Sequence, residues 1–259
     1  MRFKTYSKYW LKTSALTLQS LLATRLSSFL FLAGKFVRFF FFLAFLFVLK
    51  DRLGTIAGYS LDQVIIFFLV YNLFDLFGQF FYRGIYWFRE EIVSGSFDFT
   101  LAKPLNPLFQ ILTAHTDFLD LPLLLVVIVA LGWRLNSVSA PDLVSFAFLS
   151  LAAVIIVTAI HIAVAAVGVI TTEVDHTIWI FRDLASMGRV PIDIYVESVR
   201  AFLTFVVPIA LVFTFPAKAL LGFLTPVTIA GVLAASVFIW WLSLKFWHYA
   251  LTQYSSASS

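Results

Sequence analysis

The sequence predicts an all-α integral membrane protein in which six transmembrane helices form one domain over residues 1–259. Hydrophobic residues make up 61% of the chain and charged residues 12%, whereas soluble domains contain roughly a quarter charged residues. A helix needs roughly 20 apolar residues to cross the hydrocarbon core of a bilayer. Runs near this length lie at about 29–49, 64–81, 116–133, 143–170, 199–215 and 227–244.

Residues 1–28, which precede the first span, are predicted to form a helix in the membrane interface. This stretch contains basic residues and no acid. If the stretch is helical, its lysines lie on one face and its aromatic residues on the other. The lysines are Lys4, Lys8 and Lys12, and the aromatic residues are Tyr6, Tyr9 and Trp10. Aromatic rings at headgroup depth and ammonium groups near anionic lipid are typical of such a helix. Membrane lipid is therefore an expected partner, and a solvated basic tail is the alternative.

Several ionisable residues lie within the predicted spans, and Asp117 and Asp120 stand at the entrance of the third. Lys35 and Arg38 are near the start of the first span, from where long side chains can reach the membrane surface. Asp75 and His161 are the deepest, in the second and fourth spans. They are candidate functional groups, because an Asp at a helix centre costs roughly 2.5 to 3.5 kcal/mol to insert. The alternatives are an Asp75 bonded to neighbouring hydroxyls and a neutral His161 packed between helices.

The apolar segment 215–226, between the last two predicted spans, is bracketed by Pro216 and Pro226. Irregular backbone at membrane depth must be buried in protein or line a cavity, since lipid cannot satisfy its hydrogen bonds. We therefore predict a re-entrant pair of half-helices on the outer side.

The polar stretch 171–197 is predicted to be a loop on the cytoplasmic side. Glu173, Asp175 and His176 lie together there, and we interpret them as a solvated helix end rather than a metal site. We predict no metal ligands and no catalytic residues in this chain.

The most polar island, residues 89–109, lies within a predicted loop over 83–113. Arg89, Glu90 and Glu91 begin a short helical pattern, which Gly95 is suited to end. Pro104 then prevents the helix from continuing. Asn106 followed by Pro107 has the sequence of a new helix start. The pattern by itself fits either a polar connector or a docking surface for a partner.

The distribution of Lys and Arg predicts that both termini are cytoplasmic. In that orientation 14 of the 18 Lys and Arg residues lie inside, as the positive-inside rule requires. The outer side keeps Lys50, Arg52, Arg134 and Lys218. The 83–113 loop is then cytoplasmic.

The polar island resembles the loop between the second and third spans of ABC type-2 exporter permeases. The matching positions are Glu91, Gly95, Asp98, Leu101 and Pro104, and a narrower subfamily pattern adds Asn106 and Pro107. In that family the loop forms a coupling helix that docks in the ATP-hydrolysing subunit. The resemblance implies that docking involves Arg89, Glu90, Glu91, Gly95, Asp98, Leu101, Lys103 and Pro104. Residues 191–195, Pro208, 215–217 and 247–258 extend the likeness.

The resemblance also implies the partners and the energy source. A P-loop needs Gly-x-x-x-x-Gly-Lys-[Ser/Thr], and the only Gly-Lys pair, Gly34-Lys35, lies in an apolar run. ATP and Mg are therefore expected on a separate ATP-binding subunit, with no cofactor on this chain. A second permease chain, identical or related, is expected, in a plasma or inner membrane, without nucleic acid. The substrate is predicted to be amphiphilic or hydrophobic. The rival functions are an ion-coupled carrier using Asp75 and His161, and a membrane scaffold.

Overall fold

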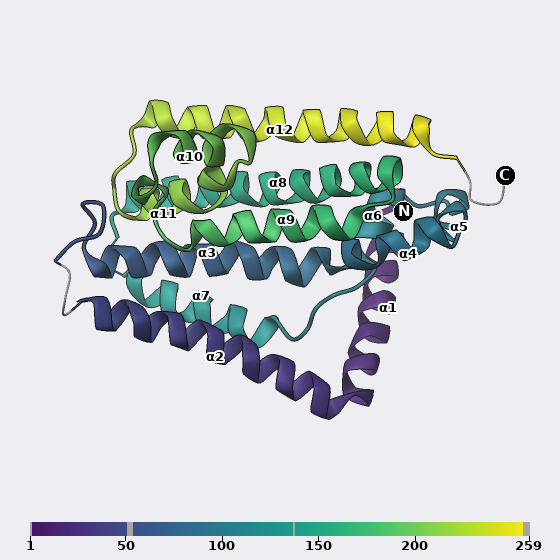
Figure 1. The fold of residues 1–259 in the computed structure, drawn as a ribbon, viewed down its shortest axis with the longest axis horizontal. Helices are drawn as coiled ribbons and strands as arrows, with labels where there is room; N and C mark the ends of the chain where they lie inside the picture. Colours follow the sequence, from purple (N-terminus) through teal and green to yellow (C-terminus); the bar gives the residue numbers. More distant parts are fainter. Residues whose placement is uncertain (1, 51–53, 137, 256–259) are drawn as a thin grey trace.

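The computed structural model describes residues 2–50, 54–136 and 138–255, and helices dominate them (Figure 1). The long elements are α1 (Arg2–Ala23), α2 (Arg25–Lys50), α3 (Leu61–Tyr82), α7 (Leu121–Leu135), α8 (Ala140–Thr171), α9 (Val174–Ser186) and α12 (Pro226–Gln253). All except α1 extend along the long axis of the molecule, and α1 lies across it (Figure 1). An all-α membrane protein is confirmed at this level. Arg52 lies outside the described residues, as do residues 256–258 of the predicted C-terminal likeness.

Short helices occupy the two ends of the bundle. The α5 end carries η1 (Arg83–Trp87), α4 (Phe88–Val93), α5 (Phe97–Ala102), α6 (Pro107–Thr113) and the last turn of α12. The α11 end carries residues 54–60, η2 (Met187–Arg189), η3 (Ile192–Ile194), α10 (Glu197–Ala201), η4 (Phe202–Val206), η5 (Ala210–Thr214) and α11 (Phe215–Leu220). Both termini of the described chain lie toward the α5 end (Figure 1).

Within the described residues, four helical segments are long and apolar enough to cross a membrane: Arg25–Leu49, Leu61–Val93, Ala140–Thr171 and Pro226–Gln253. They overlap the predicted first, second, fourth and sixth spans. The apolar helix α7 has 15 residues and is shorter. A fifth candidate is the bent pair Glu197–Val206 and Ala210–Leu220. Six spans therefore stay a prediction.

The stretch after α8 does not form a loop at one end, so that prediction was wrong. Asp175 at the start of α9 lies 3.9 Å from Arg89 at the α5 end. At the other end of this stretch, the Tyr59 hydroxyl donates to Asp193 over 2.8 Å. Residues 174–193 thus run antiparallel to 59–89 along the bundle. Val174, Ile178 and Ala185 of α9 are buried in the bundle, and the charges of α9 had made it resemble a surface loop.

The predicted fifth span and re-entrant segment also need correction. The helices on either side of Val207–Ile209 meet at 85°, so the predicted span 199–215 is broken near its middle. Pro208 lacks a backbone N–H and forces the residue before it out of the helical region. Residues 215–226 contain only α11 and a turn, instead of two half-helices. Pro216 is tolerated in the first turn of α11, and Pro226 begins α12.

The bent pair returns to the end at which it starts. It begins just after Asp193, and Lys218 near its far end forms an ion pair with Asp193 over 2.8 Å. Phe213 in its second arm is buried and packs on Tyr71 of α3, with ring centroids 4.9 Å apart. The helix pair between α9 and α12 is therefore Glu197–Leu220, one segment earlier than predicted.

The predicted N-terminal helix is present as α1, but its aromatic face contacts protein. The Tyr6 ring lies 4.8 Å from the Phe109 ring of α6, and the Trp10 ring lies 6.2 Å from the Phe81 ring of α3. The three lysines Lys4, Lys8 and Lys12 are exposed. Helix α1 is therefore packed against the α5 end on one face and presents its basic face outward.

Candidate functional site

Helices α4, α5 and α6 form a compact unit at the α5 end. Gly95 has φ of +74° and ends the first helix as predicted, since this conformation strains other residues. The Asn106 side chain accepts from the Phe109 N–H, and Pro107 follows in the first turn of α6. These two sequence signals are confirmed. Helix α5 was missed, because it has one turn and a half between two breakers.

Aromatic packing holds this unit to the long helices. The buried Phe97 ring lies 5.1 Å from the Phe88 ring and 5.0 Å from the Tyr254 ring, measured between centroids. The Tyr254 hydroxyl donates to Asp98 over 2.9 Å. On the other side, the Asn106 N–H donates to the Tyr6 hydroxyl over 3.0 Å. These contacts join the unit to α1 and to the end of α12, and α6 also packs beside α3.

The residues predicted to dock divide into two groups. Arg89, Glu90, Lys103 and Pro104 are exposed, while Gly95 and Leu101 are half-buried. Glu91 and Asp98 have internal partners: Glu91 accepts from the Thr100 hydroxyl over 3.4 Å, and Asp98 accepts from Tyr254. The sequence prediction missed Phe99 and Val93, whose exposed fractions are 72% and 58%. The sequence feature that could have identified them is an apolar residue within an otherwise polar stretch.

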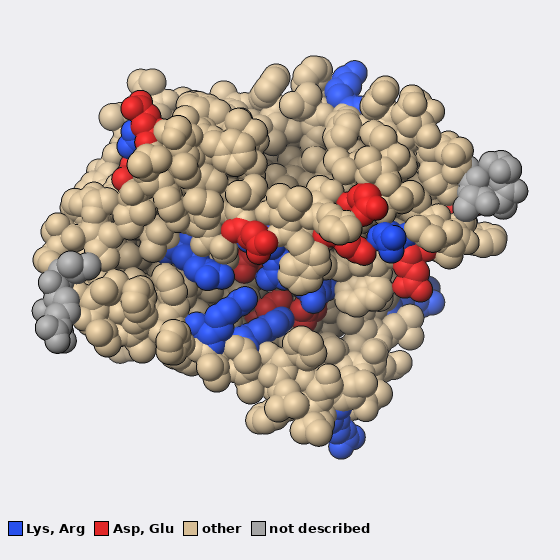
Figure 2. All heavy atoms as spheres, viewed as in Figure 1, with Lys and Arg blue, Asp and Glu red and all other residues tan. Residues whose placement is uncertain are grey.

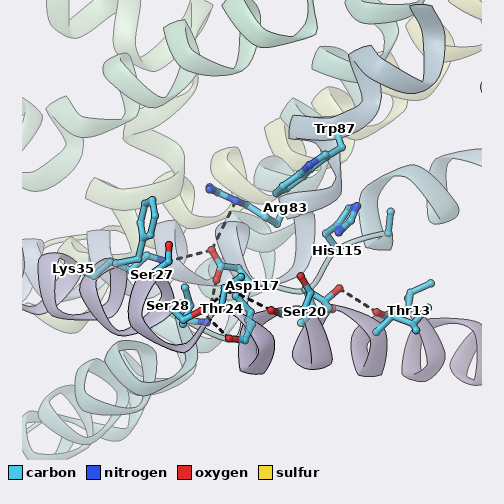
Figure 3. A pocket seen from close by; sticks show the side chains of 17 residues that line it. Thr13, Ser20, Thr24, Ser27, Ser28, Lys35, Arg83, Trp87, His115 and Asp117 are labelled. Carbon is cyan, nitrogen blue, oxygen red and sulfur yellow. Dashed lines mark hydrogen bonds and ion pairs between the residues drawn. The ribbon is translucent and has the colours of Figure 1, made fainter. Parts of the chain in front are cut away.

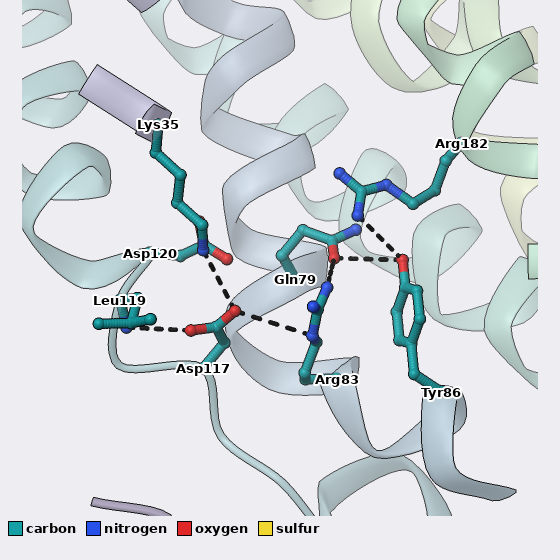
Figure 4. A network of polar contacts seen from close by, with 8 residues as sticks. All are labelled: Lys35, Gln79, Arg83, Tyr86, Asp117, Leu119, Asp120 and Arg182. Carbon is teal, nitrogen blue, oxygen red and sulfur yellow. Dashed lines mark hydrogen bonds and ion pairs between the residues drawn. The ribbon is translucent and has the colours of Figure 1, made fainter. Parts of the chain in front are cut away.

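A second set of polar residues forms a network between the long helices (Figure 4). The Lys35 ammonium of α2 donates to Asp117 over 3.2 Å and to Asp120 over 2.7 Å. Arg83 lies 3.8 Å from Asp117 and donates to Gln79 over 3.1 Å. The chain of contacts continues through Tyr86, which donates to Gln79 over 3.2 Å and accepts from Arg182 over 3.3 Å. The network joins α2, α3, α9 and the start of α7.

This network explains two departures from the sequence prediction. Lys35 points into the molecule toward Asp117 and Asp120 instead of reaching the surface. The third predicted span begins at 116, whereas α7 begins at Leu121, because Asp117 and its neighbours form an irregular segment tied to other elements. The Asp117 N–H donates to the Phe80 carbonyl over 3.1 Å, and Thr116 shares a 2.7 Å hydrogen bond with Ser14.

A cavity of about 520 Å³ opens beside this network, between α2, α3 and α9. Figure 2 shows basic and acidic side chains gathered in a hollow in the middle of this face. Its polar lining is Lys35, Arg38, Asp75, Gln79, Arg83, Asp120 and Arg182. A smaller cavity of about 170 Å³ shares Lys35 and Arg38 with it and adds Arg189. The sequence analysis assigned Arg182 and Arg189 to a loop, so it did not predict that they line these cavities.

Asp75 and His161, the predicted intramembrane pair, do not share a site. Asp75 lines the 520 Å³ cavity, and no hydroxyl donates to it within the described chain. The bonded alternative for Asp75 was therefore wrong. His161 is fully buried, with Nδ1 2.7 Å from the Val157 carbonyl oxygen and its ring against Tyr82 and Phe181. His161 is packed between helices, and an ion-coupled carrier based on the pair is not favoured.

A groove of about 510 Å³ lies between α1, the start of α2 and residues 114–119 (Figure 3). Hydroxyl side chains line much of it, and Lys35 and Arg83 lie at the end that it shares with the 520 Å³ cavity. The hydroxyls belong to Thr13, Thr17, Ser20, Thr24, Ser27, Ser28 and Thr116. The Trp87 and His115 rings stack 4.5 Å apart on its wall. The groove connects the surface near α1 with the polar network.

At the opposite end, Asp193 connects three elements. It accepts from Tyr59 over 2.8 Å and from Lys218 over 3.1 Å. Partial burial acts to raise the pKa of Asp193, but the hydrogen bonds from Lys218 and Tyr59 outweigh it and lower the pKa below its ordinary value. This contact fixes the bent pair to the loop that precedes α3.

Glu173, Asp175 and His176, at the start of α9, do not point toward a common site. His176 Nδ1 lies 2.6 Å from Glu173, whereas Asp175 faces Arg89. Over the residues that are described, no three His, Asp or Glu side chains gather as metal ligands.

Comparison with known proteins identifies a family. The sequence profile of a family described as ABC-2 family transporter protein matches residues 35–258. Neither the comparison with functionally curated proteins nor the comparison with solved structures returned a significant match. The matched residues include the α5-end unit, the polar network and the bent pair, and begin after α1.

Proposed function

The chain belongs to the ABC-2 family of transporter proteins, and on this basis we propose that it is the permease subunit of an ABC exporter. ATP hydrolysis would take place on a separate ATP-binding subunit, which carries the nucleotide and Mg. The membership and the apolar helices make the chain a multi-pass membrane protein of a transporter. The exporter direction, the ATP-binding partner and the substrate belong to the proposal.

The observation that carries the proposal is the construction of the α5 end. Phe99 on α5 and Val93 on α4 are exposed apolar side chains, and the exposed charges of Arg89, Glu90 and Lys103 lie on or directly beside the same two short helices. Exposed apolar side chains among charged ones are typical of a protein interface. We propose that this surface docks in the ATP-binding subunit. Glu91 and Asp98 would then hold the unit in shape through Thr100 and Tyr254.

Contacts from this unit to the long helices give a route for mechanical coupling. Phe97 and Asp98 contact the end of α12, and Arg89 faces Asp175 at the start of α9. A displacement of the docking unit would therefore move α9 and α12 as connected rigid bodies. Helix α9 ends beside the bent pair at the opposite end.

We propose a topology in which α2, α3, α7, α8, α9 and α12 are the six spans. The α5 end with both termini is cytoplasmic, and the pair Glu197–Leu220 is a re-entrant segment on the outer side. This assignment moves Arg189 and Arg200 outward, so the positive-inside bias weakens but keeps its sign. The α5 end keeps Lys4, Lys8, Lys12, Arg25, Arg89 and Lys103.

The polar face between α2 and α9 is proposed to line the transport path. Charged side chains within a membrane face a protein interior or a water-filled cavity rather than lipid. A second permease chain placed over this face would enclose the hollow. Each chain would then contribute half of the path.

Co-expression tests the proposed function. An affinity-tagged chain should retain an ATP-binding subunit encoded beside it through purification in mild detergent, and the complex should hydrolyse ATP. An ATP-binding subunit with a substitution in its own P-loop lysine is the control, since it should bind without hydrolysis. Recovery of the chain without any ATP-binding protein, from cells that contain the candidate partner, would refute the proposal.

A further inference from the structure

The 520 Å³ cavity carries more positive than negative charge. Four basic side chains, Lys35, Arg38, Arg83 and Arg182, line it together with the carboxylates of Asp75 and Asp120. Arg189 lies in the adjoining smaller cavity. The hollow is therefore electropositive along the face between α2 and α9.

The basic side chains are not equally neutralised. Lys35 and Arg83 face Asp117 and Asp120. Among the residues that the structure describes, no carboxylate lies within the 4.0 Å ion-pair distance of Arg38 or Arg182. Arg182 donates to the Tyr86 hydroxyl and lies over the Trp179 ring at 5.5 Å. Asp75 is the one further carboxylate that lines this cavity.

The position of Arg38 makes this imbalance important. Arg38 is exposed near the middle of α2, about 20 Å from each end at 1.5 Å per residue. Its side chain cannot readily reach either membrane surface from there. An intramembrane cation of this kind needs a counter-charge or a water-filled cavity.

The chemistry of the lining indicates the kind of group that fits. Guanidinium groups bind phosphate, sulfonate and carboxylate through paired hydrogen bonds. The cavity also contains the apolar side chains of Leu30, Phe31 and Trp179, and the exposed fraction of Phe31 is 66%. Cationic and apolar surfaces thus adjoin at the opening of one cavity.

We propose that this cavity binds the anionic head group of an amphiphile, with Arg38 and Arg182 as its main ligands. The apolar chain of the amphiphile would lie along Leu30 and Phe31. This inference names the substrate class of the proposed transport path and rests on the proposed function. The hydroxyl-lined groove beside α1 ends at Lys35 and Arg83 and gives the head group a polar way in.

Head-group selectivity tests the inference without the ATP-binding subunit. The chain is placed in phosphatidylcholine nanodiscs, and binding of radiolabelled dodecyl phosphate is measured. Unlabelled dodecyl phosphate should compete at least about tenfold better than dodecyltrimethylammonium or dodecyl maltoside, the size expected for charge-assisted hydrogen bonds. Equal competition by all three probes, or no binding, would overturn the proposal and would indicate that protein carboxylates neutralise the arginines.

Substitutions then locate the site. Arg38→Gln and Arg182→Gln should each weaken dodecyl phosphate binding by about tenfold, while Lys245→Gln on exposed α12 should leave it unchanged. Unchanged binding in both arginine variants would overturn the assignment. Because the wild-type competition needs no variant, a misfolded variant does not remove the test.

Two further arms identify the source of the anion. Competition by phosphatidylglycerol in the nanodisc would support the site and assign it to a membrane lipid. Competition by inorganic phosphate at the same concentration as dodecyl phosphate would show that the apolar chain is dispensable and would overturn the amphiphile class. Failure of the ATP-binding subunit to co-purify would refute the exporter proposal while leaving these binding results to stand.

Discussion

At the scale of single residues, Lys35 determines how the start of α7 is held. Its ammonium bridges Asp117 and Asp120, whose side chains are 10% and 3% exposed. Two nearby carboxylates repel each other unless a cation lies between them. The sequence showed a lysine at the start of a span and two aspartates 82 and 85 positions later, and nothing local could pair them.

Lys35→Met should therefore destabilise the protein. The substitution leaves two nearly buried carboxylates without their main cation, and breaking a buried ion pair costs roughly 3 to 5 kcal/mol. Because Lys35 is 20% exposed, we expect the lower end of that range, measured as a lower unfolding temperature in detergent. Lys245→Met is the matched control on an exposed face. The double variant Lys35→Met with Asp120→Asn should recover part of the loss, and additive losses would contradict the pairing.

Asp193 gives a pH-dependent contribution at the α11 end. Its folded-state pKa lies below the ordinary value, so its hydrogen bonds to Tyr59 and Lys218 stabilise the fold fully above the unfolded-state pKa of about 3.9. This stabilisation is lost as the pH falls from about 4 through the lower folded-state pKa. The unfolding temperature of Asp193→Asn should therefore lie below that of the wild type at pH 7, and the gap should narrow below about pH 4. A gap that widens in acid would show the opposite sign.

At the scale of elements, the docking unit depends on signals of two kinds. Gly95, Asn106 and Pro107 set the helix ends through local backbone chemistry, and they were readable in the sequence. The exposure of Phe99 and the inward direction of Glu91 and Asp98 depend on which face of α5 packs on α12. That choice is made by Phe97, which fills a space between Phe88 and Tyr254.

Phe99→Asp is the sharpest test of the docking surface. It places a charge in the centre of the proposed interface, and loss of one buried aromatic anchor commonly costs 2 kcal/mol or more in binding, roughly thirtyfold. The ATP-binding subunit should no longer co-purify. Trp133→Asp, at an exposed apolar position on α7 near the opposite end, is the matched control and should keep the partner. Retention of the partner by Phe99→Asp would exclude this surface.

Glu91→Lys and Asp98→Lys, at two acidic positions that the family resemblance assigns to docking, should act differently. Because both carboxylates have internal partners in Thr100 and Tyr254, these substitutions should loosen the docking unit. The partner would still bind, with weaker stimulation of its ATPase. Complete loss of partner binding would indicate that the carboxylates themselves contact the ATP-binding subunit.

At the scale of the whole molecule, the path of α9 decides the topology. The chain between α8 and the bent pair runs the length of the bundle from Asp175 to Asp193, beside α3. The helix is short and carries charges, so composition alone assigned it to a loop. Its polar side chains contact Tyr86, Arg89 and the central cavity. These contacts form only when the bundle has folded.

Cysteine labelling tests this topology, since the natural sequence contains no Cys. Single substitutions Glu90→Cys and Ile194→Cys lie on exposed residues at opposite ends of the bundle. In intact cells an impermeant maleimide should label Ile194→Cys and not Glu90→Cys, and lysis should make both accessible. Protection of Ile194→Cys in intact cells would restore the loop prediction and place α9 outside the membrane.

The sequence by itself determined the class of the protein and its local boundaries. Apolar content fixed a helical membrane protein, because a bilayer satisfies no backbone hydrogen bonds, and glycine, asparagine and proline set helix ends through short-range backbone chemistry. Tertiary structure decided where charges meet. Lys35 reaches Asp120 and Arg182 reaches the central cavity, because both outcomes depend on distant helices that pack together, which spacing along the chain does not encode.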